Sequence, residues 1–378
     1  MRRQRIALTL ASNSETATAT FTYPYGMAVI APLLKQKFPN TEVFFSLNER
    51  EILEADLVCC SGLTNAWSQV NKLGEKVTAQ DKRFIVGGQH VTALPHTLKF
   101  GEPFIGPLEC LAQISRQPLP DWTIFPDMHL PGKTHVVMTS RGCPFKCRFC
   151  SSSAFWNGYY PLPVNRVIAE ISELATLGVR NISIFDDLFT VDAKRLKNLV
   201  ERIIAAGLNS IDFSCLVRAD SVAPEVLELL RMMNVNNVAF GAESGSDVIL
   251  KMMNKKTTVK QNQHCIDLLN SFGYIPNSGI VIGFPGETPE TLALSYEFIN
   301  KNRGKCLIEI FPVHPLPGTW LWEFFMQKYS PDLDNFNWSS LSIQHNMADW
   351  ANYHLLTDGC TVEDLKQFCG RAQSLRFE

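Results

Sequence analysis

The chain has 378 residues, of which 46% are hydrophobic, a composition typical of a globular protein with a full core. Its 35 basic and 37 acidic residues give a net charge of −2. The chain therefore lacks the excess of basic residues that is typical of nucleic-acid-binding proteins. No apolar stretch approaches the roughly 20 residues that span a bilayer, and the apolar run 6–10 is too short for a secretory signal. We therefore expect a cytoplasmic protein whose partners are neither nucleic acid nor membrane.

Residues 1–115 alternate strand and helix patterns. Hydrophobic runs predict strands at 6–11, 43–47, 57–60 and 84–88, and apolar spacing predicts helices at 25–38 and 67–79. Alternating strands and helices favour a Rossmann-like parallel sheet with helices on its faces, and such sheets bind ligands at the carboxyl ends of their strands.

Residues 116–134 carry Pro118, Pro120, Pro126 and Pro131, which oppose regular structure and indicate a linker. The strand–helix alternation resumes over 135–319. Strands are expected at 135–139, 181–185, 211–216, 237–242, 278–282 and 307–313, and helices at 164–177, 193–206, 224–233, 259–272 and 289–300. This order predicts a partial (β/α)6 TIM-like barrel, in which functional groups follow each strand.

Residues 320–378 are rich in aromatic side chains, and we expect a small helical cap against the barrel. The aromatic residues fit either a lid over the substrate or additional core. The predicted fold class is therefore α/β, with a Rossmann-like sheet, a partial barrel and a C-terminal helical region.

Three of the eleven cysteines form a CxxxCxxC motif at Cys143, Cys147 and Cys150. Three thiolates on a tight loop can hold three irons of a [4Fe–4S] cube and leave the fourth iron open to a small molecule. A structural zinc site is the alternative, but zinc normally takes four ligands, and no second Cys or His pair lies nearby in the sequence.

This segment resembles the radical SAM superfamily, whose motif has an aromatic residue before the last cysteine, as Phe149 is here. The resemblance covers about residues 135–319. It implies that S-adenosylmethionine (SAM) chelates the open iron and that Phe149 packs by the adenine. It also implies that one electron, from a donor such as flavodoxin or ferredoxin, splits a carbon–sulfur bond to give an organic radical.

The resemblance extends to the ends of the second and third barrel strands. Asp187, or its neighbour Asp186, would accept from the ammonium group of SAM, although an aspartate here could also be the N-cap of the next helix. Arg218 would pair with the SAM carboxylate, although a surface ion pair with Asp220 is the alternative.

The later strand ends carry further matches. In the segment 240–246, Glu243 would reach the ribose hydroxyls or the amino group of SAM, and small neighbours would let the ligand approach. The resemblance also implies cofactor binding by Ser244 in the segment 240–246. Residues of the fifth and sixth strand segments, 279–287 and 314–319, would lie beside the adenine: Gly279, Val281, Gly283 and Pro315. No catalytic residue is assigned beyond the cluster.

Residues 25–34 and 86–95 resemble the cobalamin-binding domain found in one branch of this superfamily. The domain is shortened here and lacks the DxHxxG signature of His-ligated cobalamin. We therefore leave cobalamin binding open, with the compressed domain weighing against it. His90 is expected to be structural rather than a ligand.

The remaining cysteines contain no CxxC pair, so a second iron–sulfur cluster is not expected. Most fit buried small apolar positions, and Cys360 with Cys369 could instead form a soft ligand or thiol pair.

The leading hypothesis is a radical SAM enzyme, a transferase before a lyase or oxidoreductase, that modifies a small molecule. Three reactions remain open: methyl transfer, 3-amino-3-carboxypropyl transfer and hydrogen abstraction by a 5′-deoxyadenosyl radical. The alternatives are a tRNA-modifying methylthiotransferase, which would carry three further cysteines in its N-terminal domain, and a non-catalytic cobalamin or iron–sulfur sensor.

Overall fold

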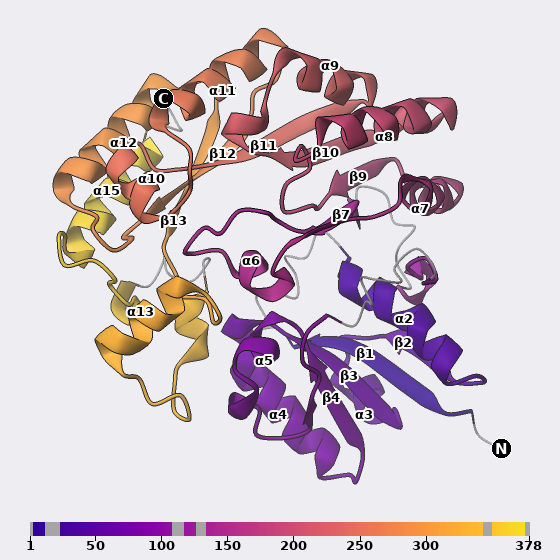
Figure 1. Ribbon diagram of the computed structural model, residues 1–378. Coiled ribbons are helices and arrows are strands. Elements are labelled where there is room, and N and C mark those ends of the chain that lie inside the picture. Colours follow the sequence, from indigo (N-terminus) through magenta and orange to yellow (C-terminus); the bar gives the residue numbers. More distant parts are fainter. Residues whose placement is uncertain (1–2, 12–22, 108–116, 126–133, 343–349, 375–378) are drawn as a thin grey trace.

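A computed structural model of the chain describes residues 3–11, 23–107, 117–125, 134–342 and 350–374 (Figure 1). Cys110, Pro126 and Pro131 lie outside these residues, as does much of the segment expected to be a linker. The described residues build two parallel sheets and a C-terminal helical region, which confirms the predicted fold class. Among the described residues, no helix is long and apolar enough to cross a membrane.

The N-terminal sheet has five parallel strands in the order β2-β1-β3-β4-β5. The strands are β1 (Arg5–Ala11), β2 (Glu42–Phe45), β3 (Leu57–Gly62), β4 (Arg83–Gly87) and β5 (Glu102–Pro103). The helices are α2 (Tyr25–Lys37), α3 (Glu49–Leu53), α4 (Trp67–Thr78) and α5 (Gln89–Ala93). This is a doubly wound strand order, in which ligands bind where the order reverses, between β1 and β3.

Alternation along β1 shows how helices come to cover both faces of this sheet. Ile6 and Leu8 belong to one hydrophobic cluster with residues of α2, whereas Ala7 belongs to a second cluster with residues of α4. Because successive strand residues point to opposite faces, one strand contributes to two cores.

The second sheet has six parallel strands in the order β6-β9-β10-β11-β12-β13. They are β6 (His135–Val137), β9 (Asn181–Ile184), β10 (Asp212–Val217), β11 (Val235–Glu243), β12 (Asn277–Ile282) and β13 (Leu307–Pro312). The helices among them are α7 (Val164–Thr176), α8 (Ala193–Ala205), α9 (Pro224–Met232), α10 (Asp247–Met252), α11 (Val259–Ser271) and α12 (Pro289–Lys301). Figure 1 shows these helices along the outer side of the sheet, as a partial barrel requires, while the N-terminal sheet lies beyond its open side.

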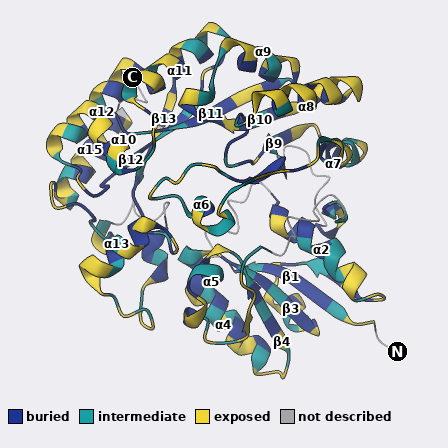
Figure 2. Cartoon of the chain, viewed as in Figure 1, coloured by how far each residue is buried: buried dark blue, intermediate teal, exposed yellow. Residues whose placement is uncertain are grey.

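The two faces of the barrel sheet differ in burial. Residues that face the helices are buried, for example Ile280 and Ile282 on β12, whereas Gly279 and Val281 on the inner face are only partly buried. Figure 2 shows that the helices covering the sheet are exposed on their outward surfaces. The inner face is therefore the side of the barrel that can receive ligands.

An antiparallel pair follows the first barrel strand and brackets the cysteine motif. It consists of β7 (Ser140–Gly142) and β8 (Tyr159–Pro161), with the short helix α6 (Ser151–Trp156) between them. Figure 1 shows α6 between the barrel and the N-terminal sheet. The motif thus occupies the boundary between the two sheets.

The C-terminal region contains α13 (Trp320–Tyr329) and α15 (Val362–Ser374), with short 3-10 helices at Trp338–Leu341 and Trp350–Asn352. Leu365 of α15 joins the hydrophobic cluster of the barrel, whereas Leu321 and Trp338 pack in the cluster that contains Trp67 and Val86 of the N-terminal sheet. The region therefore packs against both sheets.

Candidate functional site

The cysteine motif occupies the loop between β7 and α6. Cys143, Cys147 and Cys150 are each partly buried and form no disulfide. The Cys150 N–H donates to the Cys147 carbonyl at 3.2 Å, which closes the second half of the motif into a tight turn. The three thiols therefore lie on one compact loop beside the barrel strands.

Backbone hydrogen bonds fix this loop to two distant segments of the chain. The Arg148 N–H donates to the Met253 carbonyl at 3.0 Å, and the Leu321 N–H donates to the Arg148 carbonyl at 3.1 Å. The Asn254 side-chain amide donates to the Lys146 carbonyl at 2.6 Å. The loop is thus held from the turn after α10 and from the start of α13.

The chemistry of the three side chains fits an iron–sulfur cluster. Burial raises the pKa of all three thiols, so each must lose its proton when it binds metal. Within the described residues, no three His, Cys, Asp or Glu side chains converge on a position for a single metal ion. Thiolates of a cube bind different irons, so they need not converge on one point.

Asp186 and Asp187 follow β9 and have different surroundings. The buried Asp186 carboxylate accepts from Thr139 N at 2.5 Å, Ser140 N at 3.1 Å and the hydroxyls of both residues at 2.6 and 2.7 Å. It therefore fixes the chain just before β7. The N-cap of α8 is Asp192, so the N-cap alternative for the aspartates of this strand end is wrong.

Asp187 is the better candidate for a ligand contact. Its Oδ2 atom is buried and has no hydrogen-bond partner among the described residues. Burial is the main cause that raises its pKa, and its charge in turn raises the pKa of Cys143 and Cys150. The Ser152 hydroxyl and the Gly142 N–H lie close enough to the Asp187 carboxyl to lower its pKa by hydrogen bonding, and a contact of Asp187 with SAM stays a prediction.

Glu243 ends β11 in an unusual backbone conformation. Its φ of 63° lies in the left-handed region, and the pairing with β12 shifts register between Gly241 and Glu243. Such conformations cost about 1–3 kcal/mol and cluster at functional sites. The carboxylate pairs with Lys255 at 2.7 Å, and both side chains are 12% exposed.

Gly241 makes room for this pair. A Cβ atom at residue 241 would lie 2.0 Å from Glu243 Oε1 and 2.9 Å from Lys255 Nζ. Sequence reasoning did not include Lys255, because a Lys-Lys pair after a helix is typical of a solvated turn. The only sequence signal was its position shortly after the segment 240–246.

Arg218 follows β10 and is almost fully buried. Its Nε atom donates to Asp220 at 2.7 Å, another nitrogen donates to the Lys255 carbonyl, and the guanidinium lies 3.8 Å from the centre of the Phe145 ring. The alternative ion pair with Asp220 is thus present, although it is buried rather than on the surface. Arg218 supports the cysteine loop through Phe145, and its place next to SAM stays a prediction.

The other expected residues occupy three kinds of position. Phe149 and Val281 are both partly buried and pack against the same extended hydrophobic cluster. Ser244 is fully buried, and its hydroxyl lies 3.3 Å from that of Ser295 on α12, which gives it a role inside the fold. Gly283 lies under Tyr353, and Pro315 is buried after β13.

The inner face of the barrel presents apolar side chains to solvent near these residues. Phe185 at the end of β9 is 63% exposed and Leu216 of β10 is 38% exposed. Exposed apolar residues in a concave sheet next to polar groups are typical of a ligand site.

Comparison with known proteins identifies the barrel. Residues 137–299 match the radical SAM superfamily. This part of the chain is a radical SAM domain. Such a domain implies a [4Fe–4S] cluster and SAM as cofactors, which agrees with the thiols and the open carboxylate of the site.

Two relatives and one solved structure extend the comparison. An uncharacterized methyltransferase of Pyrococcus horikoshii is 36% identical over 50% of this chain and 41% of its own length. The hopanoid C-2 methylase of Rhodopseudomonas palustris is 25% identical over 79% of this chain and 63% of its own length. The chain thus spans less than two thirds of either relative.

The solved structure is that of the radical SAM methyltransferase TsrM from Kitasatospora setae, with cobalamin and a [4Fe–4S] cluster bound. The TM-score is 0.67 over 86% of this chain and 78% of that chain. Because the identity is 16%, the likeness concerns the fold alone.

The carboxyl edge of the N-terminal sheet faces the radical SAM domain. Gln89 follows β4, and its side chain accepts from the Ser151 hydroxyl at 3.0 Å, next to Cys150. The same edge exposes apolar side chains after three strands, at Leu47, Leu63 and Ile105.

His90 is not available as a cobalamin ligand in this arrangement. Its two ring nitrogens lie 3.2 Å from the hydroxyls of Thr64 and Thr97, and its ring lies 3.9 Å from that of Trp67. Burial lowers its pKa to about 3, so the ring is neutral. The structural interpretation of His90 therefore holds.

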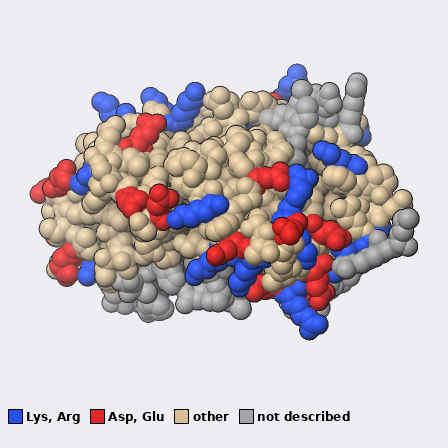
Figure 3. Space-filling view, turned by 90° about the horizontal axis from the view of Figure 1, so that it is seen from below, with Lys and Arg blue, Asp and Glu red and all other residues tan. Residues whose placement is uncertain are grey.

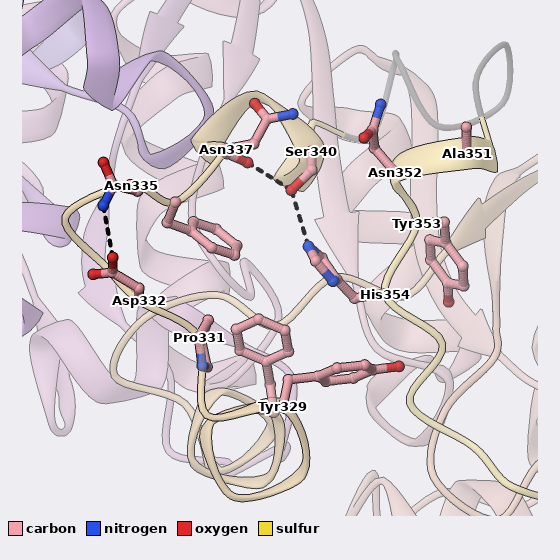
Figure 4. Close-up of a pocket in the computed structure, with 12 residues that line it drawn as sticks. Tyr329, Pro331, Asp332, Asn335, Asn337, Ser340, Ala351, Asn352, Tyr353 and His354 are labelled. Atoms are coloured by element: carbon pink, nitrogen blue, oxygen red, sulfur yellow. Dashed lines mark hydrogen bonds between the residues drawn. The ribbon is translucent and has the colours of Figure 1, made fainter.

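A separate hollow of about 470 Å³ lies in the C-terminal region, outside the radical SAM domain (Figure 4). Figure 4 shows His354 at its centre, with its ring nitrogen 3.2 Å from the Ser340 hydroxyl. Phe336 stacks on the His354 ring at 5.5 Å. Its lining comes from residues 325–354, so it includes none of the strand-end residues or thiols.

Proposed function

We propose that the protein is a radical SAM enzyme that transfers a group from SAM, in the first instance a methyl group, to a small molecule. The observation that carries the proposal is the anchored loop with three partly buried thiols and the buried Asp187 carboxyl close to two of them. A sensor would need the thiols, but it would not need a buried carboxyl next to them.

Each residue has a distinct task in this proposal. Cys143, Cys147 and Cys150 hold the cluster, and Asp187 accepts from the SAM ammonium. Glu243 reaches the ribose or the amino group of SAM, while Lys255 orients the carboxylate. When bound, the cluster and SAM supply one-electron reductive cleavage of a carbon–sulfur bond. The inner face of the barrel offers exposed apolar side chains such as Phe185 to the substrate.

Methyl transfer is favoured over the other two reactions by the relatives, because both are described as methyltransferases or methylases. The exposed Phe185 and Leu216 favour a substrate with apolar surface. Cobalamin at the apolar edge of the N-terminal sheet is compatible with this reaction and remains a separate question.

A methylthiotransferase is disfavoured by the thiols of the N-terminal sheet. Cys59 and Cys60 are consecutive on β3, so their side chains point to opposite faces. Burial raises the pKa of Cys59 to about 11 and that of Cys60 to about 12, as expected of core thiols. These two residues therefore do not form part of a second cluster site.

Anaerobic reconstitution with iron and sulfide tests the proposal. The wild-type protein should show cluster absorbance and, with SAM and dithionite, yield a SAM fragment that mass spectrometry can identify. S-adenosylhomocysteine indicates methyl transfer, methylthioadenosine indicates 3-amino-3-carboxypropyl transfer, and 5′-deoxyadenosine indicates hydrogen abstraction. The triple variant Cys143→Ala, Cys147→Ala, Cys150→Ala should lose iron, whereas Cys59→Ala should retain it. Equal iron in both variants would overturn the proposal.

A further inference from the structure

The hollow in the C-terminal region has features that the proposed function does not use. Its volume of about 470 Å³ is within the range of small-molecule sites. Figure 4 shows Asp332 on one side of His354 and Asn352 on the other. All lining residues follow the matched radical SAM segment, so a ligand bound here would need neither the cluster nor SAM.

Aromatic rings form one wall of the hollow. Phe336 stacks on the His354 ring, with the ring centres 5.5 Å apart. The rings of Phe325 and Tyr329 make edge contacts with it at 5.0 and 5.6 Å. The Tyr329 hydroxyl donates to the Leu355 carbonyl at 2.6 Å, yet this tyrosine is 41% exposed. The wall therefore offers a ligand aromatic surface that is held in place.

Hydrogen bonds decide which ring nitrogen of His354 carries the proton. The Ser340 hydroxyl lies 2.6 Å from the Asn337 carbonyl, which can only accept, so the hydroxyl donates to it. The Nε2 atom of His354, 3.2 Å from the same hydroxyl oxygen, is then the donor to Ser340. Burial lowers the pKa of His354, so the ring is neutral and its lone pair is on Nδ1. Nδ1 has no hydrogen-bond partner in the part of the chain that the structure describes, so it is open to a donor from a ligand.

The charge of the lining favours a cation. Among the described residues that line the hollow, Asp332 is the only charged one, since His354 is neutral. The Asn335 amide donates to its carboxylate at 2.7 Å and the Asp334 N–H at 3.0 Å, and these bonds lower its pKa. Lys99, the basic residue whose charge reaches Asp332, forms its ion pair with Asp334 at 3.8 Å. By contrast, Figure 3 shows basic and acidic residues intermixed over the face that it presents.

We propose that the hollow binds a small organic amine in its protonated form. The ammonium N–H donates to the His354 Nδ1 atom, and its positive charge faces the Asp332 carboxylate. The apolar body of the amine lies against the rings of Tyr329 and Phe336, whose faces also attract a cation. An alcohol lacks the charge and a quaternary ammonium lacks the N–H, so neither of them satisfies both polar groups.

Three probes of similar shape separate these contributions. Protonated 2-phenylethylamine supplies a charge and an N–H donor, 2-phenylethanol supplies a donor without charge, and trimethyl(2-phenylethyl)ammonium supplies a charge without a donor. Their affinities for the whole chain are measured by titration calorimetry at pH 7.5. The wild type should bind the primary amine about tenfold more tightly than either of the other two probes.

Two aspartate variants test the charge. Asp332→Asn should weaken the binding of 2-phenylethylamine about threefold, because exposed ion pairs contribute little, and should leave the binding of 2-phenylethanol unchanged. Asp334→Asn makes the same change in charge two residues away, outside the lining, and should leave all three affinities unchanged. Both residues lie on an exposed turn, so the two variants should fold like the wild type.

His354→Phe tests the acceptor, because it keeps an aromatic ring and removes Nδ1. This variant should lose the preference for the primary amine over the trimethylammonium probe and should still bind the latter. Equal affinity of the wild type for all three probes, or no saturable binding of the amine, would overturn the inference. An equal loss in Asp332→Asn and Asp334→Asn would do the same, and this comparison remains decisive if His354→Phe does not fold.

Discussion

Asp186 and Asp187 are adjacent at the end of β9, yet their carboxylates have different surroundings. The sequence pointed to both, because a strand end with two aspartates does not reveal which side chain faces the inner side of the barrel. The structure separates them: Asp186 accepts four hydrogen bonds from Thr139 and Ser140, while Asp187 lies close enough to Cys143 and Cys150 to raise the pKa of both thiols.

Amide replacements at the two positions should therefore affect different properties, SAM binding at Asp187 and stability at Asp186. Asp187→Asn should weaken SAM binding by the reconstituted protein about tenfold, because an acceptor for the ammonium loses its charge, and should barely change stability. Asp186→Asn should lower the free energy of unfolding by about 1–3 kcal/mol, because the amide nitrogen faces donors. Equilibrium dialysis with SAM and urea unfolding measure the two quantities. The same loss of stability in both variants would contradict these roles.

The buried Glu287 carboxyl should make the stability of the protein depend on pH. Burial raises the pKa of this carboxyl to about 7, although the Thr291 hydroxyl donates to it at 2.5 Å. Below pH 4.5 both the folded and the unfolded states hold the proton, whereas between pH 4.5 and 7 only the folded state does. Stability should therefore fall as pH rises through this range and level off above about pH 7.

The variant Glu287→Gln should remove this dependence while it keeps an acceptor for Thr291. Relative to the wild type, the variant should gain on the order of 3 kcal/mol in the free energy of unfolding between pH 5 and pH 8. Urea unfolding at both pH values gives this difference. A difference between variant and wild type that does not change with pH would show that the Glu287 carboxyl ionises normally in the folded state.

At the scale of elements, strong periodicity determined what could be predicted. The expected helix at 164–177 is α7 (Val164–Thr176), and the expected strand at 278–282 is β12 (Asn277–Ile282). The short elements around the motif were missed. Helix α6 begins with three serines directly after Cys150, and β7 carries a buried Arg141, so neither shows the hydrophobic pattern of its type.

The contact between β12 and the C-terminal region gives a prediction at this scale. Gly283 follows β12 with a φ of 79°, and a Cβ atom there would lie 2.5 Å from the Tyr353 hydroxyl oxygen. That hydroxyl is buried and has no hydrogen-bond partner among the described residues. Tyr353→Phe should therefore raise the free energy of unfolding by about 1 kcal/mol, because it removes an unsatisfied polar group.

Gly283→Ala tests the same contact from the other side. It should destabilise the protein by several kcal/mol in the wild type, and by about 1–2 kcal/mol less when combined with Tyr353→Phe, since the backbone strain remains after the clash is relieved. A double-mutant cycle measured by urea unfolding gives the coupling. Strict additivity of the two changes would show that the side chains do not meet.

At the scale of the whole molecule, a buried polar chain joins the two sheets. The Tyr25 hydroxyl of α2 donates to Glu170 of α7 at 3.3 Å and accepts from Arg141 of β7 at 3.3 Å. Residues of α2 also share a hydrophobic cluster with Val136 and Val137 of the barrel. The position of the N-terminal sheet is thus linked to the strand that leads into the cysteine motif.

Tyr25→Phe should lower the free energy of unfolding by about 1–3 kcal/mol, because it leaves two buried charged groups with one partner fewer. It should also increase proteolysis between the two sheets more than it increases proteolysis within them. The exposed Tyr160 provides the matched control, and Tyr160→Phe should change neither quantity. Equal effects of the two replacements would contradict a link through Tyr25.

Such long-range features mark the limit of what the sequence could predict about the site. The CxxxCxxC spacing pointed to the loop, and the strand ends pointed to Asp187 and Glu243. The pairing of Glu243 with Lys255, and the hydrogen bond from Leu321 to the loop, depend on how segments distant in sequence pack together. Neither contact has a local pattern that would reveal it.

The anchoring of the cysteine loop also bears on how the protein acquires and loses its iron. Peptide groups from α13 and from the turn after α10 bind the loop, so its conformation should depend less on metal than that of a zinc finger. Assembly of the cluster can then be the last event of maturation, on a chain that has already folded. Damage by oxygen would leave an intact apoprotein, and the cell could restore it with new iron and sulfide instead of synthesising the polypeptide again.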